Sequence, residues 1–354
     1  MHYLLSLATD NVFYRGIALL DSWKNSKADD FFIYDLDCSE EKKVLMKKWG
    51  AKSKPIPYND FPEKAMFYKM VLIRDFLKET ECDYVTYVDL DTQIIKNWDH
   101  LWKKDFNLYM TIRPKARSAI LNVNAGVMYL KNCERTIKFF DWCIEVMIKL
   151  SELQSEESED AIMQFCLSEA RNNKINPHKL SWWCDQLFLS AICDHIHKNS
   201  NPDNSEGIFD AYGYQVGILH CPMYNDVSEF TPDQVIDKKY LKDKYVLHYK
   251  GKRKKRVYPF IADMIRNKMD TETQKVVDKI TGEWIMEKGG PRKVWLGLRR
   301  GVTECINDYM NKHPGSDTEL VTDQTHKRWS AKLVRKYTDN IIKESKKKTE
   351  NDDV

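Results

Sequence analysis

Two copies of the tripeptide Asp-Leu-Asp are the first residues in the chain that could do chemistry. They span 35–37 and 89–91, and each follows an apolar run rich in β-branched and aromatic residues. Side chains two residues apart on a strand point to the same side, so either pair of carboxylates could converge on one cation. Oxygen ligands of this kind suit Mg²⁺ and Mn²⁺. Carboxylates at strand ends also commonly cap a turn, so the spacing alone does not distinguish a metal site from a turn.

The first copy fits a turn that leads into a helix. Asp37 is followed by Ser39, a suitable N-cap, and the segment 40–50 has an acidic first turn and ends at Gly50. The stretch also resembles the opening motif of haloacid-dehalogenase-type phosphatases, in which two aspartates after an apolar strand act as nucleophile and acid/base. Asp35 and Asp37 would take these roles, so a phosphatase is a second hypothesis. That family also needs a later acidic pair after a strand, and the adjacent aspartate pairs of this chain stand elsewhere.

The second copy is followed by three further motifs. NVNAGVMYLKN comes about thirty residues later, then WWCDQLFLSAI and finally VLHYKGKRK. In this order and spacing the set resembles the glycogenin-like (family 8) glycosyltransferases, over a region from about Leu4 to Lys254. That family has the GT-A fold, a Rossmann-like α/β architecture. The resemblance implies a metal-dependent, retaining transfer of a hexose or pentose from a nucleotide-diphospho-sugar, with UDP as the expected nucleotide, to a hydroxyl acceptor.

Matching these motifs residue by residue implies a role for each candidate. The implied ligands of Mn²⁺ (or Mg²⁺) are Asp89, Asp91 and His248. The implied reaction centre contains Asp185, Gln186 and Lys69, with Asp185 or Gln186 near the anomeric carbon in a front-face mechanism. Phe13 stands where the family usually has a stacking tyrosine, a place that Tyr14 could take instead. The implied contacts to the donor nucleotide and sugar are Leu7, Thr9, Asp10, Phe13, Tyr14, Lys69, Asp89, Leu90, Asn124, Ala125, Gly126, Gly251 and Lys254.

The chemistry of the residue types supports the same interpretation. A departing nucleoside diphosphate builds negative charge that a divalent cation neutralises and that nearby lysines stabilise. Neutral imidazole, as in His248, is a suitable third ligand. Lys69 and Asp185 lie in apolar stretches, where a buried charge is costly without a partner or a function. Each residue taken singly also has a structural explanation, and a catalytically silent nucleotide-sugar-binding protein is the third hypothesis.

Predicted strands and helices alternate along the chain, which is the pattern of the α/β folds that bind ligands at the carboxyl ends of their strands. The pattern predicts an α/β fold with a mixed, mostly parallel central sheet flanked by helices, whose ligands bind beyond the carboxyl ends of the strands. We expect strands at 3–8, 31–36, 83–90, 107–112, 125–130 and 244–251, and a further short one near 54–58. We expect helices at 11–25, 40–50, 63–79, 135–150 and 181–196.

Beyond about Pro259 the composition becomes charged and helical in pattern. We therefore expect a catalytic domain over 1–259, a C-terminal helical appendage over 260–345 and a tail over 346–354 without fixed structure. The basic segment 327–348 could touch an anionic membrane surface or a partner, or could pack on the catalytic domain.

Overall composition narrows the class of protein. The 354 residues carry a net charge of only +3, which does not indicate nucleic acid as a partner. The opening residues do not have the basic, apolar pattern of a signal peptide, so we expect none, and no stretch approaches the roughly 18 apolar residues of a membrane helix. The nine cysteines include no C-x-x-C pair, so we expect buried thiols in a reducing cytoplasm. The expected partners are a nucleotide-sugar donor and a glycan, lipid-linked or protein acceptor, with a homodimer left open.

Overall fold

The computed structural model describes residues 1–56, 65–113, 122–152, 160–175, 180–227, 234, 237–249, 265 and 269–277. The chain divides into two compact units. The first comprises 1–10, 22–228 and 243–248, and the second comprises 11–21 with the described parts of 229–242 and 249–354. Both sheets and every residue discussed below as a metal ligand belong to the first unit.

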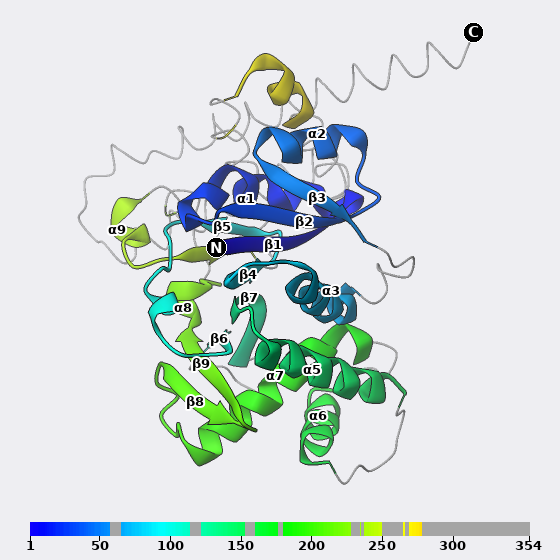
Figure 1. Cartoon of the computed structure of the whole chain (residues 1–354), viewed down its shortest axis with the longest axis vertical. Helices are drawn as coiled ribbons and strands as arrows, with labels where there is room; N and C mark the ends of the chain where they lie inside the picture. Colours follow the sequence, from blue (N-terminus) through cyan, green and yellow to red (C-terminus); the bar gives the residue numbers. More distant parts are fainter. Residues whose placement is uncertain are drawn as a thin grey trace, which may run out of the picture. The chain divides into compact units, whose positions relative to one another are not determined.

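A mixed eight-stranded sheet forms the centre of the first unit (Figure 1). Six strands run in one direction, and only β7 and β8 run against them. The expected α/β class, with a mixed and mostly parallel central sheet flanked by helices, is therefore confirmed. The strand order is β3 (Ala51–Pro55), β2 (Asp30–Leu36), β1 (His2–Thr9), β4 (Tyr84–Val88), β7 (Val123–Lys131), β6 (Leu108–Ile112), β9 (Tyr214–His220) and β8 (Gly207–Ala211).

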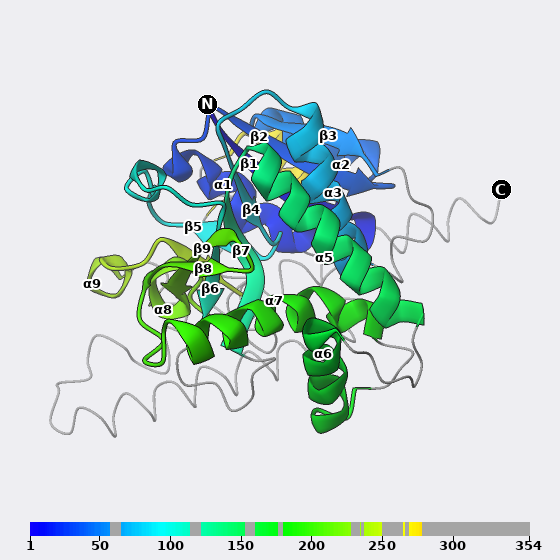
Figure 2. The same ribbon diagram turned by 60° about the horizontal axis from the view of Figure 1, so that its bottom comes forward.

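Three helices pack against one another and against the sheet through one continuous apolar core. They are α3 (Ala65–Glu79), α5 (Glu134–Glu152) and α7 (Leu180–Asn199), with α6 (Ala161–Asn172) packed on α5 and α7. Figures 1 and 2 both show α5 and α7 side by side. The strands contribute alternate residues to this core, such as Leu108, Met110 and Ile112 of β6, because successive strand side chains point to opposite faces. The core thereby holds α3 and α7, the helices that carry Lys69 and Asp185.

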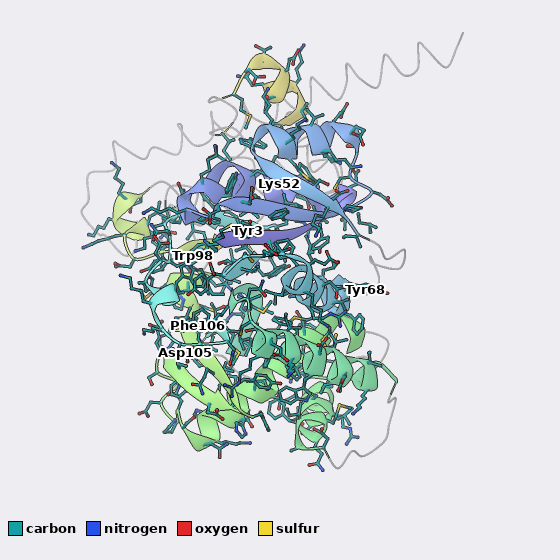
Figure 3. The ribbon with its side chains drawn as sticks, in the orientation of Figure 1. Tyr3, Lys52, Tyr68, Trp98, Asp105 and Phe106 are labelled. Carbon is teal, nitrogen blue, oxygen red and sulfur yellow. The ribbon has the colours of Figure 1, made fainter. Side chains whose placement is uncertain are left out.

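The second sheet is small but joins distant parts of the chain. It contains only β5 (Thr92–Ile94) and β10 (Val246–His248), which pair antiparallel. β5 begins directly after the second Asp-Leu-Asp copy. The segment that follows β5 is anchored by aromatic residues, and Figure 3 labels two of them, Trp98 and Phe106. The indole of Trp98 is fully buried and donates to the hydroxyl of Thr86 over 3.0 Å.

Several predicted elements differ from those in the structure. In place of one helix over 11–25 there are η1 (Asp10–Gly16), α1 (Ile17–Ser22) and η2 (Trp23–Ser26). Gly16 and Ser22 stand at the two breaks, and both residue types disfavour a helix interior. The hairpin of β8 and β9 was not expected. Its turn contains Tyr212 and Gly213, both with positive φ, as a tight two-residue hairpin requires.

Several other helices of the described residues are shorter. They are α2 (Glu40–Lys48), which begins after Ser39 as predicted and contacts β3, α8 (Cys221–Tyr224) and α9 (Lys238–Leu241). Of the expected helical region over 260–345 the structure describes only 265 and 269–277, with a helix over 271–277. The expected tail lies outside the described residues.

Two further sequence expectations concern the chain as a whole. Throughout the described part of the chain, no helix combines the length and the apolar character that crossing a bilayer would require. The cysteines of this same part are all free thiols, and most of them are buried, as expected.

Candidate metal centre and active site

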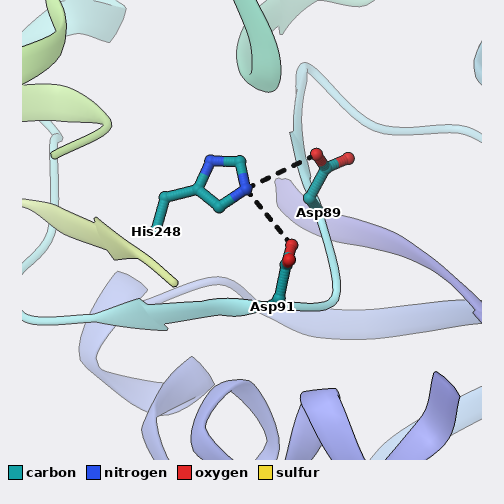
Figure 4. Close-up of side chains that lie close together, drawn as sticks. All are labelled: Asp89, Asp91 and His248. Atoms are coloured by element: carbon teal, nitrogen blue, oxygen red, sulfur yellow. Dashed lines mark ion pairs between the residues drawn. The ribbon is translucent and has the colours of Figure 1, made fainter. Parts of the chain in front are cut away.

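The structure brings Asp89, Asp91 and His248 together at the carboxyl end of β4 (Figure 4). His248 Nε2 lies 3.2 Å from Asp91 Oδ1 and 3.7 Å from Asp89 Oδ2. One ligand atom from each residue lies within 4.8 Å of the others. Two carboxylate oxygens and one imidazole nitrogen form a donor set that suits a divalent cation such as Mn²⁺. The Asp89 side chain is 27% exposed, so the cluster can be reached from solvent.

Backbone pairing explains why these three residues meet. The Asp89 amide donates to the Gly126 carbonyl over 2.7 Å, and the Thr92 hydroxyl donates to the Asp89 carbonyl over 2.8 Å. These bonds hold the turn between β4 and β5. In the β5–β10 pair His248 stands opposite Thr92. The imidazole therefore arrives beside Asp91 from a strand that is remote in sequence.

Gly126 of β7 passes very close to the metal ligands. A Cβ atom at this position would lie 2.4 Å from His248 Cε1 and 2.8 Å from Asp89 Oδ2. Real Cβ contacts are not this short, so only glycine allows β7 to pass here. The family resemblance associated Gly126 with the donor sugar, and the structure adds a steric reason for the residue.

Lys69 of α3 and Asp185 of α7 form a buried ion pair next to this cluster. Lys69 Nζ lies 2.5 Å from Asp185 Oδ2, and both side chains are almost fully buried. Burial opposes the charge, yet the carboxylates of Asp185 and Asp89 raise the pKa of Lys69 above its usual value. Lys69 therefore stays cationic beside the candidate metal site.

Tyr87 connects the ion pair to the metal ligands, and sequence reasoning did not single it out. Its hydroxyl donates to Asp89 Oδ1 over 2.8 Å, and Lys69 Nζ lies 5.6 Å from the centre of its ring. Burial, reinforced by the Asp89 carboxylate, holds the pKa of Tyr87 well above its usual value, so the phenol remains a donor. A signal was available, because Tyr87 precedes Asp89 by two residues and so lies on the same side of the strand.

The predicted donor-sugar turn lies beside the same residues. Gln186 Nε2 donates to the Val123 carbonyl over 3.0 Å, which attaches α7 to β7. Asn124 Oδ1 accepts from the Gly126 amide over 3.1 Å. Asn124 Nδ2 is buried and has no hydrogen-bond partner among the described residues. Because buried polar groups are rarely left unpaired, this donor is suited to a ligand. Ala125 is buried next to it, and its carbonyl lies 3.5 Å from Lys69 Nζ.

Other predicted nucleotide contacts lie near the carboxyl end of β1. Asp10 Oδ1 accepts from the Ser39 amide over 2.8 Å, and Asp10 Oδ2 lies 2.9 Å from Lys42 Nζ. Although partial burial acts to raise it, these partners lower the pKa of Asp10 overall. Leu7 and Thr9 are half-buried on the same strand. The nucleotide contacts of these residues stay predictions.

Some predicted residues cannot be placed beside this site. Phe13 and Tyr14 belong to the second compact unit, and both are buried there. Gly251 and Lys254 lie outside the described residues. Leu90, between the two metal-site aspartates, is buried.

The first Asp-Leu-Asp copy differs from the second in every contact. Asp35 is buried and accepts a hydrogen bond from the Ser53 hydroxyl, and burial raises the pKa of its carboxyl. Asp37 is exposed and has a φ of 51°, so it turns away in a left-handed conformation. Among the described residues neither belongs to a group of acidic, histidine or cysteine side chains that could hold a metal. These contacts support the interpretation of this copy as a strand end and turn.

Comparisons with known proteins found similarity only among solved structures. No protein-family model matches the sequence. No curated protein matches it either. The galactosyltransferase LgtC, solved with donor and acceptor sugar analogs, is 17% identical, with a TM-score of 0.41, over 71% of this chain and 87% of that one. Mouse xyloside xylosyltransferase 1 is 12% identical, with a TM-score of 0.39, over 70% and 97% of the two chains. The glycosyltransferase GlyE of Streptococcus pneumoniae is 13% identical, with a TM-score of 0.43, over 79% and 63%. These neighbours are glycosyltransferases, but similarity at this level does not identify the activity of this chain.

Proposed function

We propose that the protein is a metal-dependent glycosyltransferase of the GT-A type that uses a nucleotide-diphospho-sugar. The observation that carries this proposal is the cluster of Asp89, Asp91 and His248 directly beside the buried pair of Lys69 and Asp185. A divalent cation bound there would neutralise the charge of the departing diphosphate. The resemblance to the glycogenin-like family supports a UDP-sugar donor with a hexose or pentose, and a retaining outcome.

The protein's own residues supply orientation and charge for this reaction. Asp185 Oδ2 is held by Lys69, and its Oδ1 accepts from the Gln186 amide over 2.6 Å. A carboxylate fixed in this way can stabilise positive charge at the anomeric carbon of the donor sugar. The unpaired Nδ2 of Asn124 can donate to a sugar hydroxyl. Together these groups would favour one donor pose over the many that a flexible site allows.

The activity can be tested by measuring nucleoside diphosphate release from a panel of nucleotide sugars with Mn²⁺. We expect release with at least one UDP-sugar, and a loss of about 100-fold or more in Asp91→Asn because charge stabilisation at the phosphate would be removed. The matched control is Asp35→Asn, the equivalent change in the other Asp-Leu-Asp copy, which should retain the activity.

Three other outcomes would contradict the proposal in different ways. Phosphatase activity that is lost in Asp35→Asn would indicate the haloacid-dehalogenase-type alternative. Donor binding without release from any sugar would indicate a silent nucleotide-sugar-binding protein. A product with inverted anomeric configuration by NMR would overturn the retaining mechanism alone.

A further inference from the structure

Asn225 lies directly behind the imidazole of His248 and was not among the predicted site residues. Its Oδ1 lies 3.0 Å from His248 Nδ1, on the side of the ring away from the carboxylates. Its Nδ2 donates to Thr111 Oγ1 over 2.9 Å and to the Asn124 carbonyl over 3.3 Å. All four residues are almost completely buried. Each polar atom therefore depends on its protein neighbours rather than on water.

The orientation of the Asn225 amide follows from the proton of Thr111. The Thr111 hydroxyl donates to the Asn124 carbonyl over 2.9 Å. A hydroxyl has a single proton, so toward Asn225 the oxygen of Thr111 can only accept. The amide nitrogen must face Thr111, and the amide oxygen must face His248.

This orientation determines which nitrogen of His248 carries the proton. The amide oxygen of Asn225 is an acceptor only, so Nδ1 of His248 must be the donor. A neutral imidazole has one N–H, so Nε2 then directs its lone pair toward the space beside Asp89 and Asp91, an arrangement that a cation between the three groups would stabilise. We propose that Asn225 is a positioning residue that selects the Nδ1–H tautomer of His248 and so prepares Nε2 to bind a divalent cation. This inference rests on the metal site of the proposed function.

Backbone hydrogen bonds join the segment that carries Asn225 to the strand that carries His248. The Asp226 amide donates to the Val246 carbonyl and the His248 amide donates to the Asp226 carbonyl, each over 2.8 Å. The side chain of Asp226 is buried and lies 2.8 Å from Lys244 Nζ. Residues 225–226 thus pair with β10 directly beside the ligand. Such rigid support is what keeps a metal ligand in place.

A register shift in the main sheet brings the Thr111 hydroxyl within hydrogen-bond distance of Asn225 and of the Asn124 carbonyl. The register of β6 against β7 shifts between Met110 and Thr111, which places Thr111 opposite Asn124. A β-bulge redirects side chains in this way, and bulges recur beside functional sites. The shift is not visible in the sequence pattern, which explains why Thr111 was not predicted.

The proposal is tested with the full chain in two measurements. Long-range ¹H–¹⁵N NMR of histidine-labelled protein without metal, recorded at alkaline pH so that the imidazole is neutral, reports the tautomer of His248, assigned with His248→Gln. Titration with Mn²⁺ alone, followed by electron paramagnetic resonance, reports affinity. In Asn225→Leu we expect a mixture of tautomers and an affinity lower by roughly 10- to 100-fold, as for other outer-shell partners of metal-binding histidines. Asn225→Asp retains the acceptor and should retain the Nδ1–H tautomer.

The matched control is Asn107→Leu. Asn107 is another buried asparagine, whose Oδ1 accepts from the Gln215 amide over 2.8 Å, and it contacts no metal ligand in the described chain. It should leave both the tautomer and the Mn²⁺ affinity unchanged. If Asn225→Leu fails to fold, Asn225→Ser is smaller, remains polar and loses the same contact to His248.

The outcomes separate this inference from the proposed function. Wild-type Mn²⁺ affinity and an unchanged tautomer in Asn225→Leu or Asn225→Ser would overturn the positioning role and leave the metal site intact. A wild-type chain that binds no Mn²⁺ would overturn the metal-dependent function itself.

Discussion

Lys69 and Asp185 illustrate at the scale of single residues how a buried charge depends on its partner. Both side chains are almost fully buried, so the charge of Asp185 depends on Lys69 rather than on water. In Lys69→Met the Asp185 carboxylate would remain buried and unpaired. We expect a loss of about 3–5 kcal/mol in the free energy of unfolding, measured by urea denaturation. Adding Asp185→Asn should recover part of it.

The control for this prediction is another lysine of the same helix. Lys78 pairs with Asp141 over 3.1 Å, and its side chain is 46% exposed. Lys78→Met should therefore cost less than about 1 kcal/mol. Equal losses of unfolding free energy in Lys69→Met and Lys78→Met would show that burial does not determine how strongly the Lys69–Asp185 pair stabilises the fold.

At the scale of elements, the close approach of β7 to the metal ligands gives a second prediction. A methyl group at position 126 would collide with the His248 ring and the Asp89 carboxylate. Gly126→Ala should therefore weaken Mn²⁺ binding by roughly tenfold or more, because it displaces two of the three ligands. Titration with Mn²⁺ measures this effect.

Gly217 of β9 offers a control, since it is even more crowded than Gly126 but faces Tyr109. A Cβ atom there would lie 1.8 Å from Tyr109 Cδ1. Gly217→Ala should destabilise the fold by about 1–3 kcal/mol through overpacking and leave Mn²⁺ affinity unchanged in the folded protein. Unchanged Mn²⁺ affinity in Gly126→Ala would contradict the steric role of Gly126.

The elements that sequence patterns predicted are those whose burial is regular. β1, β2, β4, β6 and β7 lie where apolar runs placed them, and α3, α5 and α7 follow helical spacing. The β8–β9 hairpin was missed because β8 is mostly half-buried and β9 has four consecutive buried residues, so neither strand shows a regular alternation of burial. The short β5 was missed because three residues carry no periodic signal. Its pairing with β10 is a long-range contact that local propensity does not encode.

At the scale of the whole molecule, His2 links folding to pH. His2 is the first residue of β1, and its side chain is buried. Its Nε2 lies 2.9 Å from the hydroxyl of Thr86 on the neighbouring strand β4. Burial lowers the pKa of His2 to about 4, although the nearby Asp29 carboxylate opposes this. The unfolded chain binds the proton near pH 6.5, so stability is fully present above that pH and is lost as the pH falls toward about 4. Between pH 7 and pH 5 we expect a loss of roughly 2 kcal/mol from this group.

The contribution of His2 is isolated by comparing urea denaturation of the wild type and His2→Gln at both pH values. The variant has no titrating imidazole, so its stability should fall by roughly 2 kcal/mol less over this interval. Parallel losses in the two proteins would show that His2 is not buried in its neutral form. Urea denaturation measures stability and not activity, so this comparison tests the fold alone.

The sequence by itself determined the alternation of strands and helices, the alignment of motifs and the candidate residues. It could not distinguish the two Asp-Leu-Asp copies by their own residues, since the tripeptides are identical. The motifs that follow the second copy favoured it as the metal site, and the tertiary structure shows which contacts each copy makes. Pairing of β5 with β10 brings His248 to Asp91, while Asp35 binds Ser53 and Asp37 turns to solvent. The physical reason is that a metal site needs ligand atoms within a few ångströms of one another, and long-range pairing rather than local sequence sets those distances.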